Sequence, residues 1–193
     1  IIEDTFQRGG NVIIPAFAVE RTQDLLYYLG RLDLDGRLPE CKIYVDSPLA
    51  ISASAIFKTS VKYFDDQTKS AIDEIWQSPD VLNRFVMTRS AEESKKLNEI
   101  QSGAIIISAS GMCDAGRIKH HLKHNLWREE SSIVFVGFQA QGTLGRLIID
   151  GHKRVRIHGE QIAVNAQIHN LDGFSAHADQ NALLKWVESF KRL

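Results

Sequence analysis

A histidine near the carboxyl end of the sequence is the side chain best suited to chemistry. Ser175 is of a residue type that caps helices, which would place His177 in the first helical turn. The positive end of a helix dipole disfavours a charged imidazole, so a ring there is suited to bonding an anion or a carboxylate. The plain alternative is an N-cap followed by a structural histidine. The segment reads Gly173-Phe174-Ser175-Ala176-His177-Ala178-Asp179.

Two further segments combine glycine with arginine, in residues 110–117 and 139–146. Glycine lets the backbone approach a ligand closely, a helix N-terminus offers free amides, and arginine can make a paired contact with a phosphate. Taken alone, the first segment is better explained as a turn that needs glycine, and the second matches neither the dinucleotide fingerprint nor the phosphate-binding lysine loop. Together they indicate a cleft bordered by cationic side chains, with the candidate phosphate-binding residues Gly111, Arg117, Gly142 and Arg146.

One acidic residue argues against a strong phosphate site in the first of these loops. Asp114 lies between Gly111 and Gly116, and it would add negative charge where an anion binds. Arg21 is a third candidate cation for the same edge. The alternative for Arg21 is an exposed helical arginine paired with Asp24 or Glu20, and the sequence does not separate the two.

His120 and His124 are four residues apart on an expected helix, a spacing that can bind zinc. No carboxylate lies between them, and they project away from the apolar face formed by Ile118, Leu122 and Leu126. We interpret the pair as part of a solvated face and assign no metal ligand to this chain.

The elements that must position these residues follow one recurring pattern. A short apolar run, a loop of small or polar residues and a helical stretch occur in succession five times, and the apolar runs lack in–out alternation. Such runs are typical of parallel sheets covered by helices on both faces, where ligands bind at the carboxyl ends of the strands. The five units begin NVIIPAFAVERTQ, KIYVDSPLA, RFVMTRSAEES, AIIISASGMCDAGR and SIVFVGFQAQGTLGR.

We therefore predict an α/β fold with a Rossmann-like, mostly parallel sheet of about five strands flanked by helices. Alternation in Arg154–His158 and Ile162–Ile168 predicts an added antiparallel hairpin, and a last helix is expected from about Ala178. Helix starts are expected at Ser47 and at Ser90.

Composition limits the function classes. The net charge of −1 argues against a protein that binds nucleic acid over its whole surface, so any such contact must be local. No apolar run is long enough to cross a membrane, and no membrane partner is expected. The two distant cysteines, Cys41 and Cys113, favour free thiols in the cytoplasm over a disulfide framework. The chain opens without Met in what resembles the tail of a helix, so we expect a piece of a longer protein.

Several stretches together resemble one family. The segment from Phe174 to Asp179 is similar to motif B of the β-CASP family, the RNA- and DNA-processing branch of the metallo-β-lactamase superfamily. Four other stretches resemble the family in the same order and cover nearly the whole chain. They are Ile14–Ala18 with Arg21 and Gln23, Val45–Ala50, Ser108–Met112, and Gly137–Ala140 with Gly142–Leu144. The form is similar to that of prokaryotic RNA-processing nucleases related to the eukaryotic pre-mRNA 3′-end endonuclease.

The resemblance implies a zinc-dependent ribonuclease, with endonuclease or 5′-exonuclease action, that hydrolyses RNA phosphodiester bonds. Its RNA would thread between this domain and a metallo-β-lactamase domain of the same polypeptide, with a homodimer as a further partner. It implies that His177 contacts the scissile phosphate beside two zinc ions, and that Ser175 lies next to the phosphate. Residues 1–174 would form the β-CASP domain, truncated at its N-terminal side, and residues 175–193 would begin the return to the metallo-β-lactamase fold.

The sequence also departs from the family pattern. The HxHxDH zinc motif and the acidic residue of motif A are absent, and motif C would follow Leu193. Hydrolysis of this kind needs a metal to activate water, so we expect no bound cofactor and no cleavage by this chain alone. Two alternatives remain: a DNA-processing member of the family, and a non-catalytic RNA- or nucleotide-binding module.

Overall fold

A six-stranded sheet organises the molecule, and every neighbouring pair of its strands is parallel. The computed structural model describes residues 1–174 and 178–190. The strand order is β3-β2-β4-β1-β5-β8, so β1 lies between two strands that come much later in the chain. The strands are β1 (Val12–Pro15), β2 (Lys42–Val45), β3 (Phe85–Met87), β4 (Ala104–Ser108), β5 (Ser132–Phe135) and β8 (Gln167–Asn170).

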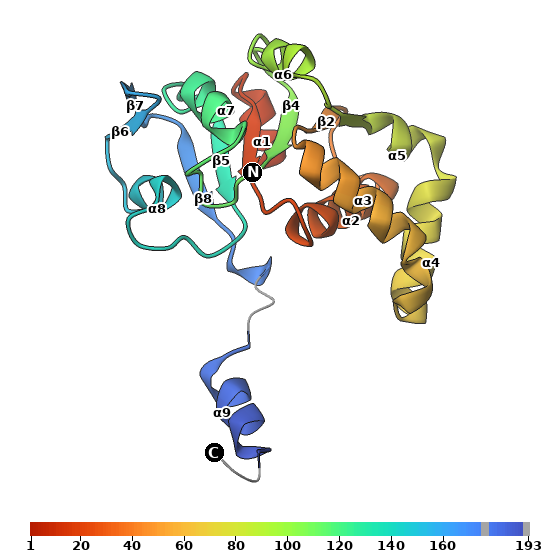
Figure 1. The fold of residues 1–193 in the computed structure, drawn as a ribbon. Coiled ribbons are helices and arrows are strands. Elements are labelled where there is room, and N and C mark those ends of the chain that lie inside the picture. The colour runs from red at the N-terminus through yellow and green to blue at the C-terminus, as the bar shows by residue number, and fades with distance from the viewer. Residues whose placement is uncertain (175–177, 191–193) are drawn as a thin grey trace.

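Helices cover both faces of this sheet, as the continuous apolar strands predict (Figure 1). One face packs against α7, α8 and the hairpin, and the other against α1 and α2. The helices are α1 (Ile2–Gln7), α2 (Arg21–Leu34), α3 (Pro48–Thr59), α4 (Asp66–Gln77), α5 (Pro79–Arg84), α6 (Ala91–Leu97), α7 (Ile118–Asn125), α8 (Leu144–Ile149) and α9 (Gln180–Glu188), with short 3-10 turns at Val61–Tyr63 and Asp172–Phe174.

The two sides of the sheet supply two separate parts of the core, because successive strand residues point to opposite faces. Ile13 and Ile106 pack with Leu122 of α7, whereas Val12 and Ile105 pack on the side of α2. These strand residues are fully buried or nearly so. The α/β class and the flanking helices predicted from the sequence are therefore confirmed.

Both expected helix starts are present. Ser47 is the N-cap of α3, where its side chain accepts a hydrogen bond from the amide of Ala50. Ser90 and Glu93 form a capping box at the start of α6, in which each side chain bonds the backbone of the other residue.

The hairpin is shorter than the alternation suggested. It consists of β6 (Arg154–Ile157) and β7 (Glu160–Ala163), which are antiparallel. Residues 167–170 instead form β8, which adds a sixth strand to the main sheet beside β5. The amides of Asn165 and Ala166 both donate to the carbonyl of Leu126, and this anchor ends the hairpin arm before β8 begins.

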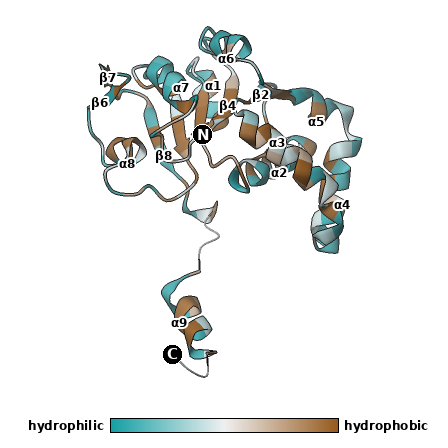
Figure 2. Cartoon of the chain, viewed as in Figure 1, coloured by the Kyte–Doolittle hydropathy of each residue, from teal (hydrophilic) through white to brown (hydrophobic). Residues whose placement is uncertain are grey.

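Helix α9 lies apart from the rest of the molecule (Figure 1). It has the expected amphipathic pattern, but none of its residues is buried. Part of its ribbon is brown, and therefore hydrophobic, in Figure 2. Its exposed apolar residues include Leu183, Leu184 and Trp186. Among the described residues, no helix has both the length and the apolar character needed to cross a membrane.

Candidate functional site

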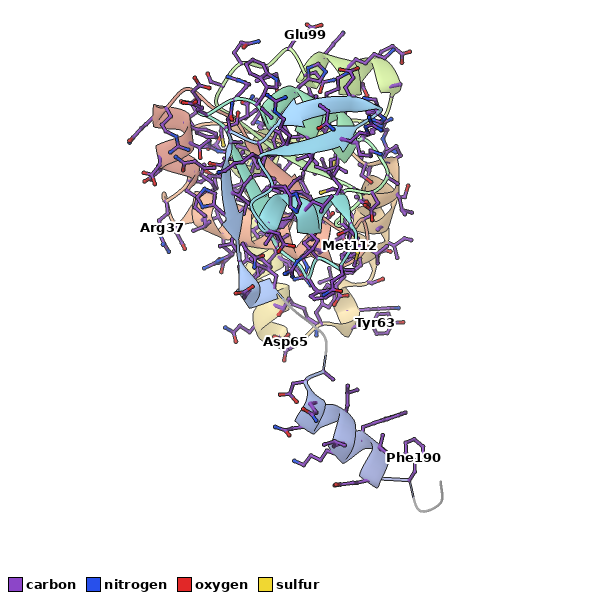
Figure 3. The ribbon with its side chains drawn as sticks, turned by 90° about the vertical axis from the view of Figure 1, so that its left-hand side faces the viewer. Arg37, Tyr63, Asp65, Glu99, Met112 and Phe190 are labelled. Carbon is purple, nitrogen blue, oxygen red and sulfur yellow. The ribbon has the colours of Figure 1, made fainter. Side chains whose placement is uncertain are left out.

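The loops singled out in the sequence all follow the carboxyl ends of strands. Because the sheet is parallel, these ends meet at one edge, and the loops after β1, β4, β5 and β8 are gathered there. Met112, in the loop after β4, lies nearer to the chain that leads to α9, while Glu99, before β4, lies at the far end of the molecule (Figure 3). The candidate site is therefore this edge of the sheet.

Hydrogen bonds join the two glycine-containing loops directly. The side-chain amide of Gln139 donates to the carbonyl of Gly111 at 2.8 Å. The amide of Gly145 donates to the carbonyl of Met112 at 3.1 Å. Gln139 is 4% exposed, and its buried Oε1 has no donor among the described residues. The two loops are thus held together, and the buried side chain of Gln139 makes one of the hydrogen bonds between them.

Asp114 also links the two glycine-containing loops. Its Oδ1 accepts a hydrogen bond from the amide of Leu144, the first residue of α8, at 2.9 Å. A carboxylate at this position complements the positive end of a helix. The negative charge that argued against an anion site is therefore already engaged with the other loop.

Gly111 and Gly142 differ in what surrounds them. A Cβ at Gly111 would lie 3.1 Å from the backbone nitrogen and ring of Phe17, so the backbone there is closely packed against the loop after β1. Gly142 has a φ of +83° and open space where a Cβ would lie. Of the two, Gly142 is the position whose backbone remains accessible to a ligand.

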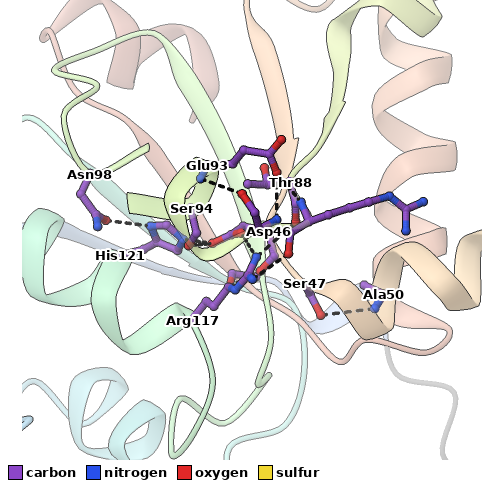
Figure 4. Close-up of polar contacts among 12 residues, drawn as sticks. Asp46, Ser47, Ala50, Thr88, Glu93, Ser94, Asn98, Arg117 and His121 are labelled. Atoms are coloured by element: carbon purple, nitrogen blue, oxygen red, sulfur yellow. Dashed lines mark hydrogen bonds and ion pairs between the residues drawn. The ribbon is translucent and has the colours of Figure 1, made fainter. Parts of the chain in front are cut away.

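Arg117 contacts protein groups in the structure. Its guanidinium donates to Asp46 Oδ1 at 2.7 Å, and to the carbonyls of Thr88 at 3.2 Å and Arg89 at 2.9 Å. These contacts tie the start of α7 to the ends of β2 and β3 (Figure 4). Arg117 therefore holds its loop in place, and three of its five N–H donors are engaged with the protein.

Asp46 is the centre of a buried polar network that the sequence analysis missed. Its Oδ2 accepts a hydrogen bond from Ser94 at 2.6 Å and lies 2.7 Å from Nε2 of His121. Asp46 and His121 are both 0% exposed. Burial alone would raise the pKa of the Asp46 carboxyl, but hydrogen bonds from His121, Ser94 and Arg117 outweigh it and hold the pKa below its ordinary value.

A sequence signal for this network does exist. Residues 118, 121, 122 and 125 follow the i, i+3, i+4, i+7 spacing of a buried helix face, and all four are buried. The spacing places His121 on the core side of α7, while His120 and His124 attract notice only by their mutual spacing. A carboxylate directly after strand β2, whose last residue Val45 is buried, is the natural partner for a buried histidine.

Arg146 pairs with Asp150 one turn further along α8. Its Nε donates to Oδ2 at 3.0 Å, and its NH2 group lies 2.9 Å from Oδ1, which makes the contact bidentate. Both side chains are partly exposed, so solvent weakens the pair and the guanidinium stays accessible.

Arg21 lies beside the segment that leads to the candidate histidine. Its guanidinium carbon is 5.7 Å from the centre of the Phe174 ring, and NH1 is 3.8 Å from the carboxylate of Asp24. Arg21 is buried at 8% exposure, so it is not the exposed arginine of the alternative interpretation, although the predicted proximity to Asp24 is present. Ser175 and His177, which follow Phe174, lie outside the described residues.

No cluster of three or more potential metal ligands occurs among residues 1–174 and 178–190. The ring of His120 stacks on that of His158, with centroids 4.5 Å apart. Burial, followed by the neighbouring His158, lowers the pKa of His120. The described residues thus do not fit a zinc site, and we assign no zinc ligand to them.

Comparisons with known proteins agree with this architecture. Residues 22–148 match the family model described as the Beta-Casp domain, and residues 161–192 match the model described as a Zn-dependent metallo-hydrolase RNA specificity domain. The second description supports zinc dependence in proteins that carry this segment.

Three curated relatives match nearly the whole chain. The protein named "Ribonuclease TTHA0252" from Thermus thermophilus is 39% identical over 100% of the chain and 44% of its own length. The transcription termination factor FttA of Methanosarcina mazei is 31% identical over 97% of the chain and 30% of its own length. An RNase J-like protein of Methanocaldococcus jannaschii is 30% identical over 99% of the chain and 43% of its own length.

The chain thus spans less than half the length of each of these relatives. The family model nevertheless matches more than half of this chain, in the part that forms most of the sheet and the joined glycine loops. On these grounds the chain belongs to the Beta-Casp domain family.

Proposed function

We propose that this chain is the RNA-clamping part of a zinc-dependent ribonuclease that hydrolyses RNA phosphodiester bonds. The single observation that carries the proposal is the joined pair of glycine loops at the carboxyl edge of the sheet, in a family whose relatives are named ribonuclease and RNase J-like. Loops of this kind can hold a phosphate through backbone amides while excluding bulky side chains.

The residues divide into those that contact RNA and those that hold the loops. We assign phosphate contacts to Ser175 and to the backbone near Gly142, with Arg21 and Arg146 supplying positive charge nearby, and we assign to Gly111 the close packing of its loop against Phe17. Arg117 acts through its contact with Asp46, because NH1 and NH2 already bond groups of the protein. We assign to His177 a direct contact with the scissile phosphate or the leaving oxygen.

Metal chemistry belongs to polypeptide outside this chain. Two zinc ions in the intact protein would polarise the phosphate and activate water. The described residues of this chain contribute binding and orientation, and the chain alone is expected to leave RNA uncut. In this arrangement the partners are RNA, the metallo-β-lactamase domain of the same polypeptide and a second copy of the protein, and the location is the cytoplasm.

The test is the substitution His177→Ala in the intact protein. Loss of a residue that moves or orients a proton typically costs roughly 10²- to 10⁴-fold in rate, so RNA cleavage should fall by at least 100-fold. Zinc content and melting temperature should stay unchanged. His152→Ala, which removes an exposed histidine from the turn after α8, is the matched control and should cleave RNA normally.

Two results would contradict the assignment of His177. Unchanged cleavage would show that it takes no part in the reaction, and joint loss of zinc and folding would make it structural. Cleavage of single-stranded DNA in preference to RNA of the same sequence would support the DNA-processing alternative. Salt-sensitive RNA binding without cleavage by the intact protein would support the non-catalytic alternative.

A further inference from the structure

A small cavity lies next to the joined glycine loops, at the carboxyl ends of β5 and β8. Its volume is about 260 Å³, which is below the roughly 300–1,000 Å³ typical of sites for drug-sized ligands and suits one flat ring system better than a whole nucleotide. Its aliphatic lining residues are Val136, directly after β5, Ile149 of α8, and Leu171, directly after β8. The other lining residues are Gly137, Phe138, Gln139, Arg146, Asn170 and Asp172.

Phe138 is the most unusual of these residues. It is 70% exposed, although it follows a strand whose residues are all buried and precedes Gln139, which is 4% exposed. An exposed phenylalanine at the rim of a cavity offers a flat apolar surface without any partner among the described residues at its exposed face. Unstacked nucleobases of single-stranded RNA bind to aromatic side chains in this way.

The charges around the cavity favour a neutral group over a phosphate as its occupant. The guanidinium of Arg146 already forms a bidentate contact with Asp150, although both side chains are partly exposed. Asp172 adds a further carboxylate, one oxygen of which accepts a hydrogen bond from Asn170 at 2.9 Å. A neutral base with N–H groups on its edge would find acceptors in this carboxylate, and the plane of Arg146 can also stack on a base.

The position of the cavity fits a base attached to a bound phosphate. Gln139 lines the cavity and also donates to the carbonyl of Gly111, so the cavity and the phosphate-binding loops share one residue. A nucleotide whose phosphate contacts those loops would have its base within the same region of the surface.

We propose that this cavity is a nucleobase subsite, in which one unstacked base of the RNA stacks on Phe138 and presents its edge to Asp172. The inference rests on the proposed function, because it assumes an RNA strand at the glycine loops. It adds to that function a residue that holds one particular nucleotide of the strand.

The experiment removes the aromatic ring and the base separately and together. Phe138→Ala is compared with the wild-type intact protein on a set of RNAs of one sequence, each lacking the base of a single nucleotide. Affinity is measured with the metal chelated, and cleavage is measured with the metal present. The matched control is Trp127→Ala, because Trp127 is also exposed (55%) but precedes β5 at the opposite edge of the sheet.

We expect the effect of Phe138→Ala on affinity to depend on the presence of the base at one nucleotide only. Stacking of one base is worth roughly 5- to 100-fold in affinity, so Phe138→Ala should weaken binding of the complete RNA by that factor. It should cause no further loss on the RNA that lacks the matching base. Phe138→Trp should preserve binding, and Trp127→Ala should have no effect on any RNA.

Other results would overturn the subsite. If Phe138→Ala weakened the binding of every RNA equally, or lowered the melting temperature relative to the wild type, Phe138 would be shown to pack against protein. If the intact protein cleaves RNA but the effect of Phe138→Ala on affinity does not depend on any single base, the subsite is rejected and the proposed function stands. If the effect depends on one base but the intact protein cleaves no RNA, the subsite stands and the proposed function is rejected. A wild-type protein that binds no RNA would reject both.

Discussion

The imidazole of His121 and the carboxylate of Asp46 meet at 2.7 Å in the interior of the protein, although 75 positions separate them in the sequence. The contact joins the carboxyl end of β2 to the middle of α7. Arg117, one turn before His121, contacts the other oxygen of the same carboxylate. A single buried carboxylate thus holds the helix that follows the first glycine loop.

Asp46→Asn should destabilise the fold strongly. The substitution keeps the shape of the side chain but leaves Arg117 and His121 without their acceptor charge. Breaking a buried ion pair by removing one partner costs about 3–5 kcal/mol in free energy of unfolding, which urea denaturation would measure. Asp150→Asn removes the partner of Arg146 in a partly exposed pair, and should cost less than about 1 kcal/mol. Equal losses in the two variants would contradict the central role of Asp46.

Stability should depend on pH through the same carboxyl. The pKa of Asp46 is lowered in the folded state, so its charge stabilises the fold at pH values above the unfolded pKa of about 3.9. This contribution is lost as the pH falls through the lower, folded pKa. The free energy of unfolding should therefore decrease below about pH 4, and the decrease should be smaller in Asp46→Asn. Parallel pH profiles for the two proteins would refute this prediction.

Gly116→Ala should be more damaging than a substitution at another glycine of similar backbone conformation. Gly116 has a φ of +82°, and an added Cβ would overlap the carbonyl of Ala109. Gly36 has a φ of +65° but open space around it. The left-handed conformation alone costs roughly 1–2 kcal/mol, so Gly36→Ala should lose about that much and Gly116→Ala clearly more. Thermal unfolding of both variants would measure the difference between their stability losses. Equal losses would show that the backbone near Ala109 can shift to accommodate the added Cβ, against the prediction.

Both thiols should be unreactive in the folded protein. Burial raises the pKa of Cys41 to about 11 and that of Cys113 higher still. Because the thiolate is the reactive form, a thiol reagent at neutral pH should label neither residue until the protein unfolds. The time course of labelling, with and without denaturant, provides the measurement. Rapid labelling of Cys113 under native conditions would show that the core around α7 opens.

The pattern of the sequence predicted the fold in most respects. Apolar strands such as Ala104–Ser108 and caps such as Ser47 are local signals, and both were interpreted correctly. The assignment of β8 failed because the boundary at Asn165 depends on a contact with Leu126, far away in the sequence. Local alternation cannot report such a contact.

The candidate site was only partly accessible to the same reasoning. Glycine and arginine marked the correct loops, but residue type does not show which partner a charged side chain has. Arg117 and Asp114 resemble groups that attract or repel a ligand, yet each bonds another part of the protein. His121 was missed because the spacing of His120 and His124 suggested a metal pair, whereas His121 shares the buried face of α7 with Ile118 and Leu122.

The central place of β1 has a consequence for synthesis on the ribosome. Both of its neighbours in the sheet, β4 and β5, come later in the chain, and β4 begins about 90 residues after β1 ends. At roughly 5–20 residues per second, the apolar strand Val12–Pro15 must wait several seconds for its first partner. During that interval the nascent chain is prone to aggregation and is a natural client for chaperones that shield apolar segments.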